Sequence, residues 1–193
     1  MVFVTGGTGL VGARLIFDLL NRGEQVKALK RPETAPEKAL PYFSAYTDQP
    51  GQYLERVTWV EGDLLDLDSL LTHIEPECDI YHCAAKVSFF SDDKKLIDET
   101  NVEGTANMVN AALINRARKF CHVSSIGALG SMINGSQINE ETAWLASGKS
   151  AYSFSKYLSE LEVWRGMAEG LNAVIVNPSV ILGAGNWTQG SNS

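Results

Sequence analysis

The first residues of the chain place three evenly spaced glycines between a short apolar run and an amphipathic helix. Residues 1–5 suit a buried parallel strand. Gly6, Gly9 and Gly12 follow, and from Leu10 onward apolar residues recur at helical spacing. A strand that passes through a glycine loop into a helix begins a β-α-β unit. No other feature of the sequence constrains the fold as strongly.

Each of these glycines has its own physical reason. Gly6 permits a tight turn, Gly9 lets the backbone approach a phosphate, and Gly12 lets the helix pack closely on the strand. The free N–H groups at the helix start, around Leu10 and Val11, would face a pyrophosphate. The pattern predicts a dinucleotide-binding loop, and a plain glycine turn is the alternative.

Strand and helix patterns alternate along the rest of the chain. Strands are expected near residues 2–5, 25–30, 57–60, 79–83, 119–124 and 172–177. Helices are expected near residues 10–22, 67–73, 93–116 and 151–169, the last with an apolar stripe at Leu158, Leu161, Trp164 and Ala168. Residues 32–56 are rich in proline and should be loop, apart from a short helix between Pro36 and Tyr46. The alternation predicts an α/β fold with a doubly wound parallel sheet of the Rossmann type.

Composition narrows the class of protein. The 193 residues suit one sizeable core. The net charge of −7 argues against nucleic acid or an anionic membrane surface as a partner. No apolar run approaches the length of a membrane span, and we therefore expect a cytoplasmic protein.

Cysteine and histidine positions do not suggest a metal site. Cys78, Cys83 and Cys121 lie in or beside predicted strands without metal-ligand spacing, so we expect reduced core thiols and no metal. His82 and His122 each adjoin a cysteine, but neighbours on a strand point to opposite faces. Buried histidines are therefore the better interpretation.

Tyr152 and Lys156 lie four residues apart in a predicted helix and should share one face. A phenol has a pKa of about 10, which is high for acid–base catalysis at neutral pH. An adjacent ammonium would favour the phenolate and lower that pKa. The pair could therefore move a proton, although an ordinary surface Tyr-Lys pair has the same spacing.

Two serines end the fifth predicted strand. Ligands of doubly wound sheets lie at the carboxyl ends of the strands, where Ser124 and Ser125 fall. Ser125 could hydrogen-bond the substrate oxygen that Tyr152 protonates or deprotonates. Turn capping is the alternative for both serines, and it carries more weight for Ser124.

Taken together, these residues resemble the extended short-chain dehydrogenase/reductase family, also called the NAD-dependent epimerase/dehydratase family, in its dihydroflavonol-reductase-like branch. The resemblance implies that Ser125, Tyr152 and Lys156 are the catalytic residues. It implies cofactor contacts at Gly6, Gly9, Leu10, Val11, Gly12, Arg31, Asp63, Leu64, Ala84, Ala85, Tyr152, Lys156, Asn177, Pro178 and Ser179. Asp63 could instead cap a loop or helix. Asn101, in a segment that resembles the family's NVxGT motif, could be a buried asparagine bonded to backbone.

The end of the second strand bears on the choice of cofactor. NAD-specific members place an acid there to hold the ribose 2′-hydroxyl. Here the segment reads Ala28-Leu29-Lys30-Arg31-Pro32, and Arg31 stands where dihydroflavonol-reductase-like members carry an arginine associated with the 2′-phosphate. A guanidinium suits a phosphate dianion, so we expect NADP in preference to NAD. A solvated basic pair is the alternative.

The resemblance implies an NAD(P)-dependent oxidoreductase that moves hydride between a nicotinamide cofactor and a carbonyl or alcohol of a small molecule. A nucleotide-sugar epimerase or dehydratase and a non-catalytic NAD(P)-binding sensor or scaffold are the alternatives. Phe89 and Phe90 would suit a flat apolar substrate or serve in packing.

Family members carry a C-terminal lobe that builds most of the substrate pocket, and the sequence stops without one. Residues 1–193 are therefore expected to form the NAD(P)-binding Rossmann domain, as the N-terminal part of a longer protein, with its cleft face partly uncovered. For the oligomeric state, we consider a homodimer.

Overall fold

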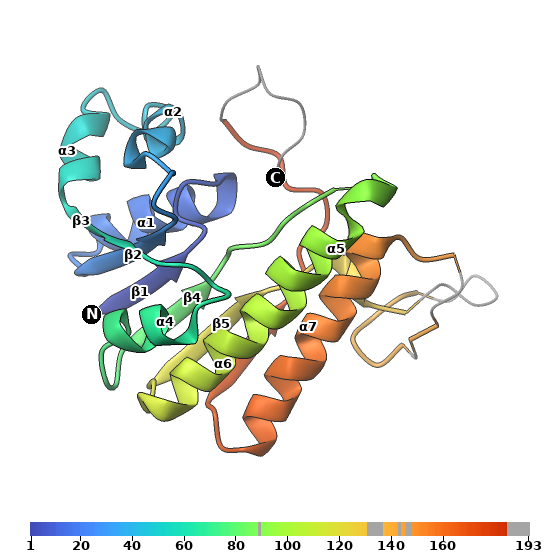
Figure 1. The fold of residues 1–193 in the computed structure, drawn as a ribbon. Coiled ribbons are helices and arrows are strands. Elements are labelled where there is room, and N and C mark those ends of the chain that lie inside the picture. Colours follow the sequence, from blue (N-terminus) through green and yellow to red (C-terminus); the bar gives the residue numbers. More distant parts are fainter. Residues whose placement is uncertain (89, 131–136, 143, 146–147, 185–193) are drawn as a thin grey trace.

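A computed structural model describes residues 1–88, 90–130, 137–142, 144–145 and 148–184. At its centre lies a parallel sheet of six strands in the order β3-β2-β1-β4-β5-β6 (Figure 1). The strands are β1 Val2–Thr5, β2 Val26–Lys30, β3 Val57–Glu61, β4 Asp79–His82, β5 Lys119–Val123 and β6 Ala173–Val176. All six predicted strands are confirmed, and so is the doubly wound parallel sheet.

Helices cover both faces of this sheet (Figure 1). The α-helices are α1 Leu10–Asn21, α2 Leu40–Phe43, α3 Pro50–Glu55, α4 Leu67–His73, α5 Lys94–Ile97, α6 Gly104–Ile114 and α7 Ala151–Ala168, and short 3₁₀ segments are Pro36–Ala39, Ser91–Asp93 and Ile126–Ala128. A π-helical segment, Asp98–Glu103, joins α5 to α6, so the predicted helix 93–116 contains one wide turn. The prediction of loop around residues 50–55 is wrong, because Pro50 begins α3, where its fixed φ suits the first helical turn.

The side chains of β1 alternate between two apolar cores, one on each face of the sheet. Val2 and Val4 pack with Ile16 of α1 in one core. Phe3 belongs to the other core, together with Met108 of α6. Because successive strand residues point to opposite faces, a four-residue strand buried on both sides reads as a continuous apolar run. This explains why β1 could be predicted from so short a segment.

Helix α7 packs with its polar side inward. Its buried residues include Ser155, Lys156 and Ser159. Leu161 and Trp164, from the predicted apolar stripe, are 45% and 56% exposed. Leu161 and Trp164 therefore face outward, and the buried face of α7 is polar in its first half, whereas Val163 joins the apolar core further along the helix. In the part of the chain that the structure describes, no helix is both long and apolar enough to cross a membrane.

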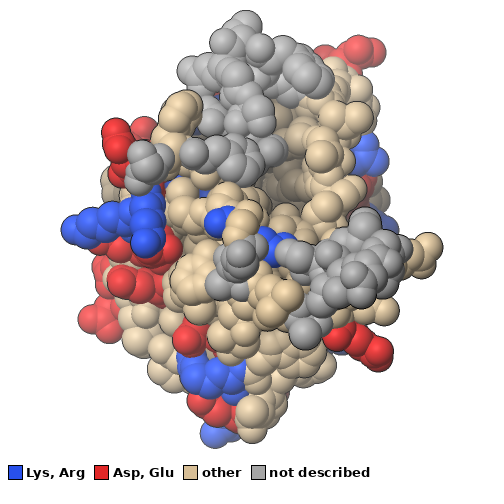
Figure 2. Space-filling model, turned by 90° about the vertical axis from the view of Figure 1, so that its right-hand side faces the viewer, with Lys and Arg blue, Asp and Glu red and all other residues tan. Residues whose placement is uncertain are grey.

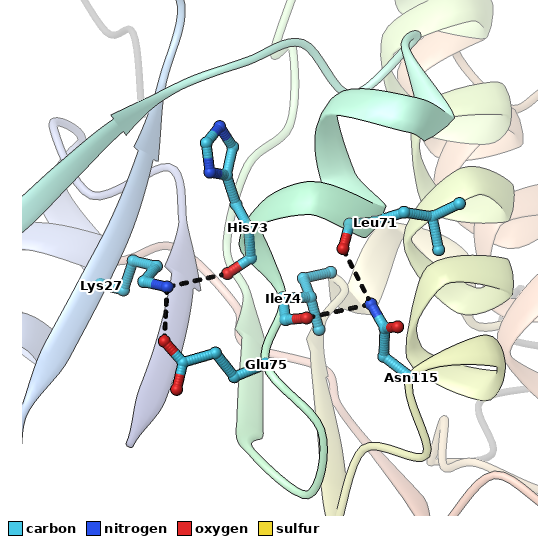
Figure 3. Close-up of polar contacts among 6 residues, drawn as sticks. All are labelled: Lys27, Leu71, His73, Ile74, Glu75 and Asn115. Atoms are coloured by element: carbon cyan, nitrogen blue, oxygen red, sulfur yellow. Dashed lines mark hydrogen bonds and ion pairs between the residues drawn. The ribbon is translucent and has the colours of Figure 1, made fainter.

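A lysine of β2 and the asparagine that follows α6 hold the last turn of α4 at the amino edge of the sheet (Figure 3). Lys27 Nζ donates to the His73 carbonyl at 3.2 Å. Asn115 Nδ2 donates to the carbonyls of Leu71 and Ile74, at 3.3 and 3.0 Å. Carbonyls in the last turn of a helix lack intrahelical partners, so these contacts satisfy them. They fix the link from α4 to β4 on the edge opposite the glycine loop.

The glycine loop between β1 and α1 requires close backbone contact. Gly6 has a φ of +70°, and a Cβ there would lie 2.7 Å from the Ala84 nitrogen. A Cβ on Gly12 would lie 2.2 Å from the Gly6 carbonyl oxygen, which is backbone and cannot rotate away. The predicted tight turn and close packing of α1 are confirmed at these two positions.

Gly12→Ala should lower the free energy of unfolding by about 2 kcal/mol, because the added methyl overlaps fixed backbone atoms. Urea denaturation would measure this change. Gly51→Ala is the matched control, since a Cβ on Gly51 in α3 meets nothing within 4 Å. We expect the control to match or slightly exceed the wild type, because alanine favours helix. A Gly12→Ala protein as stable as the wild type would contradict the close contact.

Candidate active site

The glycine loop presents the start of α1 at the carboxyl edge of the sheet. The Gly9 amide donates to the Gly6 carbonyl at 3.0 Å, and Gly9 begins α1 without a side-chain cap. The first turn of α1 contains no acidic residue. Among the described residues, a Cβ on Gly9 would meet only the Gly6 oxygen, at 3.4 Å, while Gly183 after β6 lies against the Leu10 side chain. A helix start without a side-chain cap and without acidic residues fits an anionic group such as a pyrophosphate at the amides of Leu10 and Val11.

A buried polar chain ties the end of β4 to the glycine loop. The Ala84 amide donates to Thr5 Oγ1 at 3.2 Å. Thr5 Oγ1 lies 2.8 Å from His82 Nδ1, and His82 Nε2 lies 3.0 Å from Thr105 Oγ1 on α6. Burial lowers the pKa of His82 to about 3, so the imidazole is neutral at physiological pH. The prediction of a buried histidine is confirmed, and Ala84 lies against Gly6, while its predicted contact with a cofactor stays a prediction.

Ser125 and Tyr152 meet at the carboxyl end of β5. The Ser125 hydroxyl lies close enough to the Tyr152 phenol to affect its pKa, and Ser125 Oγ accepts from the Gly127 amide at 3.0 Å. Burial raises the pKa of Tyr152, and the hydrogen bond from Ser125 partly opposes this. The structure thus brings together two of the three residues predicted for proton transfer. The capping role considered for Ser125 is also present, through Gly127.

Lys156 lies one turn further along α7 and is 2% exposed. Its Nζ donates to the Val123 carbonyl at 2.9 Å. Burial lowers the pKa of this ammonium to about 8. Burial is the main influence on the Tyr152 pKa in this structure and the Lys156 ammonium is bonded to the Val123 carbonyl, so the predicted lowering of that pKa by Lys156 stays a prediction. Lys156 still lies at the same edge as Tyr152.

Asn101 joins the loop after β4 to α7. Its Oδ1 accepts from the Lys86 amide at 2.7 Å, and its Nδ2 donates to the Lys86 carbonyl at 3.0 Å and to Ser155 Oγ at 2.9 Å. The residue is 1% exposed. These contacts match the interpretation of Asn101 as a buried asparagine bonded to backbone.

The segment after β6 is bonded to the end of β5. Asn177 Nδ2 donates to the Ser125 carbonyl at 3.1 Å and to Glu160 at 2.6 Å, and the Ile126 amide donates to the Pro178 carbonyl at 3.0 Å. Ser179 follows and is exposed. Ser124 donates to the same Glu160 oxygen, which is not the backbone capping role considered for it. The sequence analysis did not single out Glu160, although its place four residues after Lys156 could have drawn notice.

The ends of β2 and β3 hold the remaining predicted contacts. Arg31 Nε lies 3.1 Å from Glu33 Oε1, with side chains 64% and 66% exposed. The sequence analysis overlooked Glu33. Asp63 Oδ1 accepts from the Leu65 amide at 2.9 Å, which is the loop role considered as its alternative. Leu64 is 9% exposed and its side chain lies in the core, so only its backbone could reach a ligand.

The three cysteines are free thiols, as predicted. Burial raises the pKa of the Cys83 thiol to about 12 and also raises the pKa values of Cys78 and Cys121. Thiols of this kind are poor nucleophiles because little thiolate forms. Within the described ranges, no three His, Cys, Asp or Glu side chains gather in a way that could hold a metal ion.

The face turned to the viewer in Figure 2 mixes basic and acidic side chains, and a hollow lies among uncharged residues in its upper half.

Apolar side chains are exposed in and after β6, where Val174 is 53% exposed and Val180 and Leu182 are each 83% exposed. These exposures agree with the expected uncovered face. Phe90 is 78% exposed, and Phe89 lies outside the described residues.

The fold defines the class of protein, and comparison with known proteins defines the family. A parallel six-stranded sheet with a glycine loop at its centre is the dinucleotide-binding fold. The model of the NAD dependent epimerase/dehydratase family matches residues 2–193. The chain therefore belongs to this family, as the sequence motifs predicted.

Three similar proteins show how much of a typical relative this chain represents. A Synechocystis sp. protein named as a candidate dihydroflavonol 4-reductase is 34% identical over 94% of this chain and 49% of its own length. Sterol demethylase protein B of Methylococcus capsulatus is 33% identical over 93% of this chain and 51% of its own length. The crystal structure of gox2253 is 31% identical, with a TM-score of 0.77 over 92% of this chain and 51% of that one. The chain spans about half the length of the curated relatives it matches.

The buried ammonium of Lys156 should make stability depend on pH. Folding lowers the pKa of Lys156 from 10.5 to about 8. Below about pH 8 both states carry the proton, and the folded state bears the full cost of burying the charge. Between these pKa values the folded state loses the proton while the unfolded state keeps it, so the stability contributed by this group rises with pH.

Lys156→Met removes this titration, so its stability relative to the wild type should fall by about 3 kcal/mol as the pH rises from about 8 to 10.5, whereas the lost bond to the Val123 carbonyl lowers its stability at every pH. Urea unfolding at several pH values would measure it. Lys119→Met removes an exposed lysine from β5 and is the control, for which we expect no such trend. A Lys156→Met difference that stays constant with pH would contradict the assignment.

Proposed function

We propose that the protein is an NAD(P)-dependent oxidoreductase that transfers hydride between a nicotinamide cofactor and a carbonyl or alcohol of a small molecule. The observation that carries the proposal is that the turn after Ser125 packs against the start of α7, which carries Tyr152 and, one turn later, the buried Lys156. These residues lie at the carboxyl edge of the sheet, the edge that carries the glycine loop. Proton-transfer groups and a dinucleotide loop on one edge are what such a reaction needs.

The chain's own residues would bind the cofactor and move one proton. The amides of Leu10 and Val11 would hold the pyrophosphate, as the uncapped helix start supports. The cofactor, when bound, supplies or accepts the hydride. Tyr152 would transfer the proton to or from the substrate oxygen, and Ser125 would orient that oxygen by a hydrogen bond. Lys156 would bond the cofactor ribose, which requires its Nζ to leave or share the Val123 carbonyl.

Two observations support a reductase over a nucleotide-sugar epimerase or dehydratase. The Synechocystis relative carries a reductase name at 34% identity. Arg31 at the end of β2 also follows the reductase pattern, because its guanidinium can pair with a 2′-phosphate. The presence of Ser125, Tyr152 and Lys156 together counts against a sensor or scaffold without catalysis.

The whole protein would carry a C-terminal lobe that completes the substrate pocket, which the length of the relatives and the exposed Leu182 support. It would form a homodimer through the outer side of α7, where Leu161 and Trp164 are exposed. Its location would be the cytoplasm, where thiols such as Cys83 stay reduced.

The chain should bind NADPH more tightly than NADH, and isothermal titration calorimetry at one ionic strength would compare them. Arg31→Ala should weaken NADPH by about tenfold and leave NADH nearly unchanged, because only the 2′-phosphate needs the guanidinium. Glu33→Gln is the matched variant. It removes the carboxylate that pairs with Arg31 at 3.1 Å, and it should tighten NADPH. Equal affinities for both cofactors in the wild type would remove the argument for NADP.

Tyr152→Phe in the full-length protein should lower kcat at least about 100-fold, because it removes the phenol that transfers the proton. Its cofactor affinity should stay close to wild type, since the ring still packs. Tyr157→Phe is the control, because it removes a phenol hydroxyl five residues further along the same helix and keeps the ring stacked on Trp144 at 4.3 Å. Turnover can be followed as NADPH oxidation with a panel of ketones. Wild-type turnover in Tyr152→Phe would mean that another group moves the proton.

A further inference from the structure

One carboxylate connects three elements of the candidate site. A single oxygen of Glu160, on α7, accepts hydrogen bonds from the hydroxyl of Ser124 and from Nδ2 of Asn177, the latter at 2.6 Å. Ser124 directly follows β5 and is 5% exposed, and Asn177 directly follows β6. Bonds to an ionised acceptor are stronger than neutral ones. Glu160 therefore holds the carboxyl ends of two neighbouring strands against one helix.

Each partner of Glu160 adjoins a residue of the proposed chemistry. Ser124 precedes Ser125, and Asn177 Nδ2 also donates to the Ser125 carbonyl at 3.1 Å. Lys156 lies one turn before Glu160, and the carboxylate raises the pKa of Lys156 against the larger effect of burial. Glu160 thus favours the charged form of the lysine while it fixes the backbone on both sides of Ser125.

The sheet order places these contacts over one half of a bound dinucleotide. The glycine loop follows β1, which lies between β2 and β4. A dinucleotide whose pyrophosphate rests on this loop extends to both sides of it. The adenosine half then lies over the ends of β2 and β3, beside Arg31. The nicotinamide half lies over the ends of β4, β5 and β6, where Glu160 acts.

We propose that Glu160 is a positioning residue for the nicotinamide half of the site. It holds Ser124 and Asn177 at a fixed place on α7, and through them it sets Ser125 and the segment 177–179 relative to Tyr152. It acts on the cofactor only through these neighbours. The inference rests on the proposed cofactor binding and adds to it a residue that distinguishes the two halves of the ligand.

The test compares a whole dinucleotide with its adenosine fragment. Wild-type and Glu160→Ala proteins are titrated calorimetrically with NADPH and with 2′,5′-ADP, or with NADH and ADP if the wild type prefers NADH. Glu160→Ala should weaken the dinucleotide by about tenfold or more, because two hydrogen bonds to a charged group are lost. The fragment should change by less than about twofold, because it does not reach the ends of β5 and β6.

Two variants separate positioning from general stability. Glu160→Gln keeps an acceptor oxygen and should recover most of the lost affinity for the dinucleotide. Glu162→Gln makes the same charge change on the same helix, where the side chain pairs with Arg165 at 2.9 Å, and should bind both ligands like the wild type. If Glu160→Ala does not fold, Ser124→Ala removes one of the two donors and should show a smaller loss with the same selectivity for the dinucleotide.

The affinities for the dinucleotide and for the fragment decide between the possible outcomes. Equal weakening of dinucleotide and fragment would overturn the proposal, because it would mean that Glu160 supports the fold as a whole. Unchanged dinucleotide affinity in Glu160→Ala would also overturn it, while the proposed cofactor binding would stand. A folded wild-type chain that binds neither NADPH nor NADH would overturn the proposed function, and this inference with it.

Discussion

Helix α7 can lie against the sheet only because the polar groups on its inner face find partners. Ser159 Oγ donates to the carbonyls of Asn101 and Ser155, each at 2.7 Å, and Lys156 Nζ donates to the Val123 carbonyl at 2.9 Å. Burying such a group without a partner would cost about 1–3 kcal/mol if it is neutral and more if it is charged. These bonds fix the rotation of α7, and therefore the place of Tyr152 at the edge of β5.

The glycine loop imposes a second constraint on the same edge. Gly12 lies so close to the Gly6 carbonyl that a side chain would not fit, and Gly6 itself lies against Ala84. The start of α1 and the loop after β4 are therefore locked together at the centre of the sheet. Asn101 then bonds the Lys86 backbone and Ser155 of α7, so the constraint extends from the loop after β4 to the proton-transfer helix. The candidate site is thus held by backbone contact on one side and by buried hydrogen bonds on the other.

Much of the fold could be predicted from local sequence, because strands buried on both faces and glycine turns leave clear patterns. The helix at Pro50 was missed, since proline was interpreted as a breaker although it also begins helices. The inner face of α7 was missed for a different reason. Leu161 and Trp164 are exposed, whereas the buried face combines Val163 with Ser155 and Ser159, and the burial of these two serines depends on tertiary partners that the sequence pattern does not reveal.

The candidate site likewise contains residues that the sequence could predict and residues that it could not. Ser125 and Tyr152 could be matched to motifs, and the structure brings them into contact. The pKa direction at Tyr152 could not be predicted, because it depends on burial and on where the Lys156 ammonium is bonded. Glu160 belongs to no motif used in the sequence analysis, and its role depends on β5 and β6 ending side by side.

A crystal structure of this chain with NADPH would test the central claim most directly. The account predicts the pyrophosphate against the amides of Leu10 and Val11, and the nicotinamide ribose within hydrogen-bond reach of Tyr152 and Lys156. A pyrophosphate bound elsewhere, or a nicotinamide half that lies away from α7, would contradict the account.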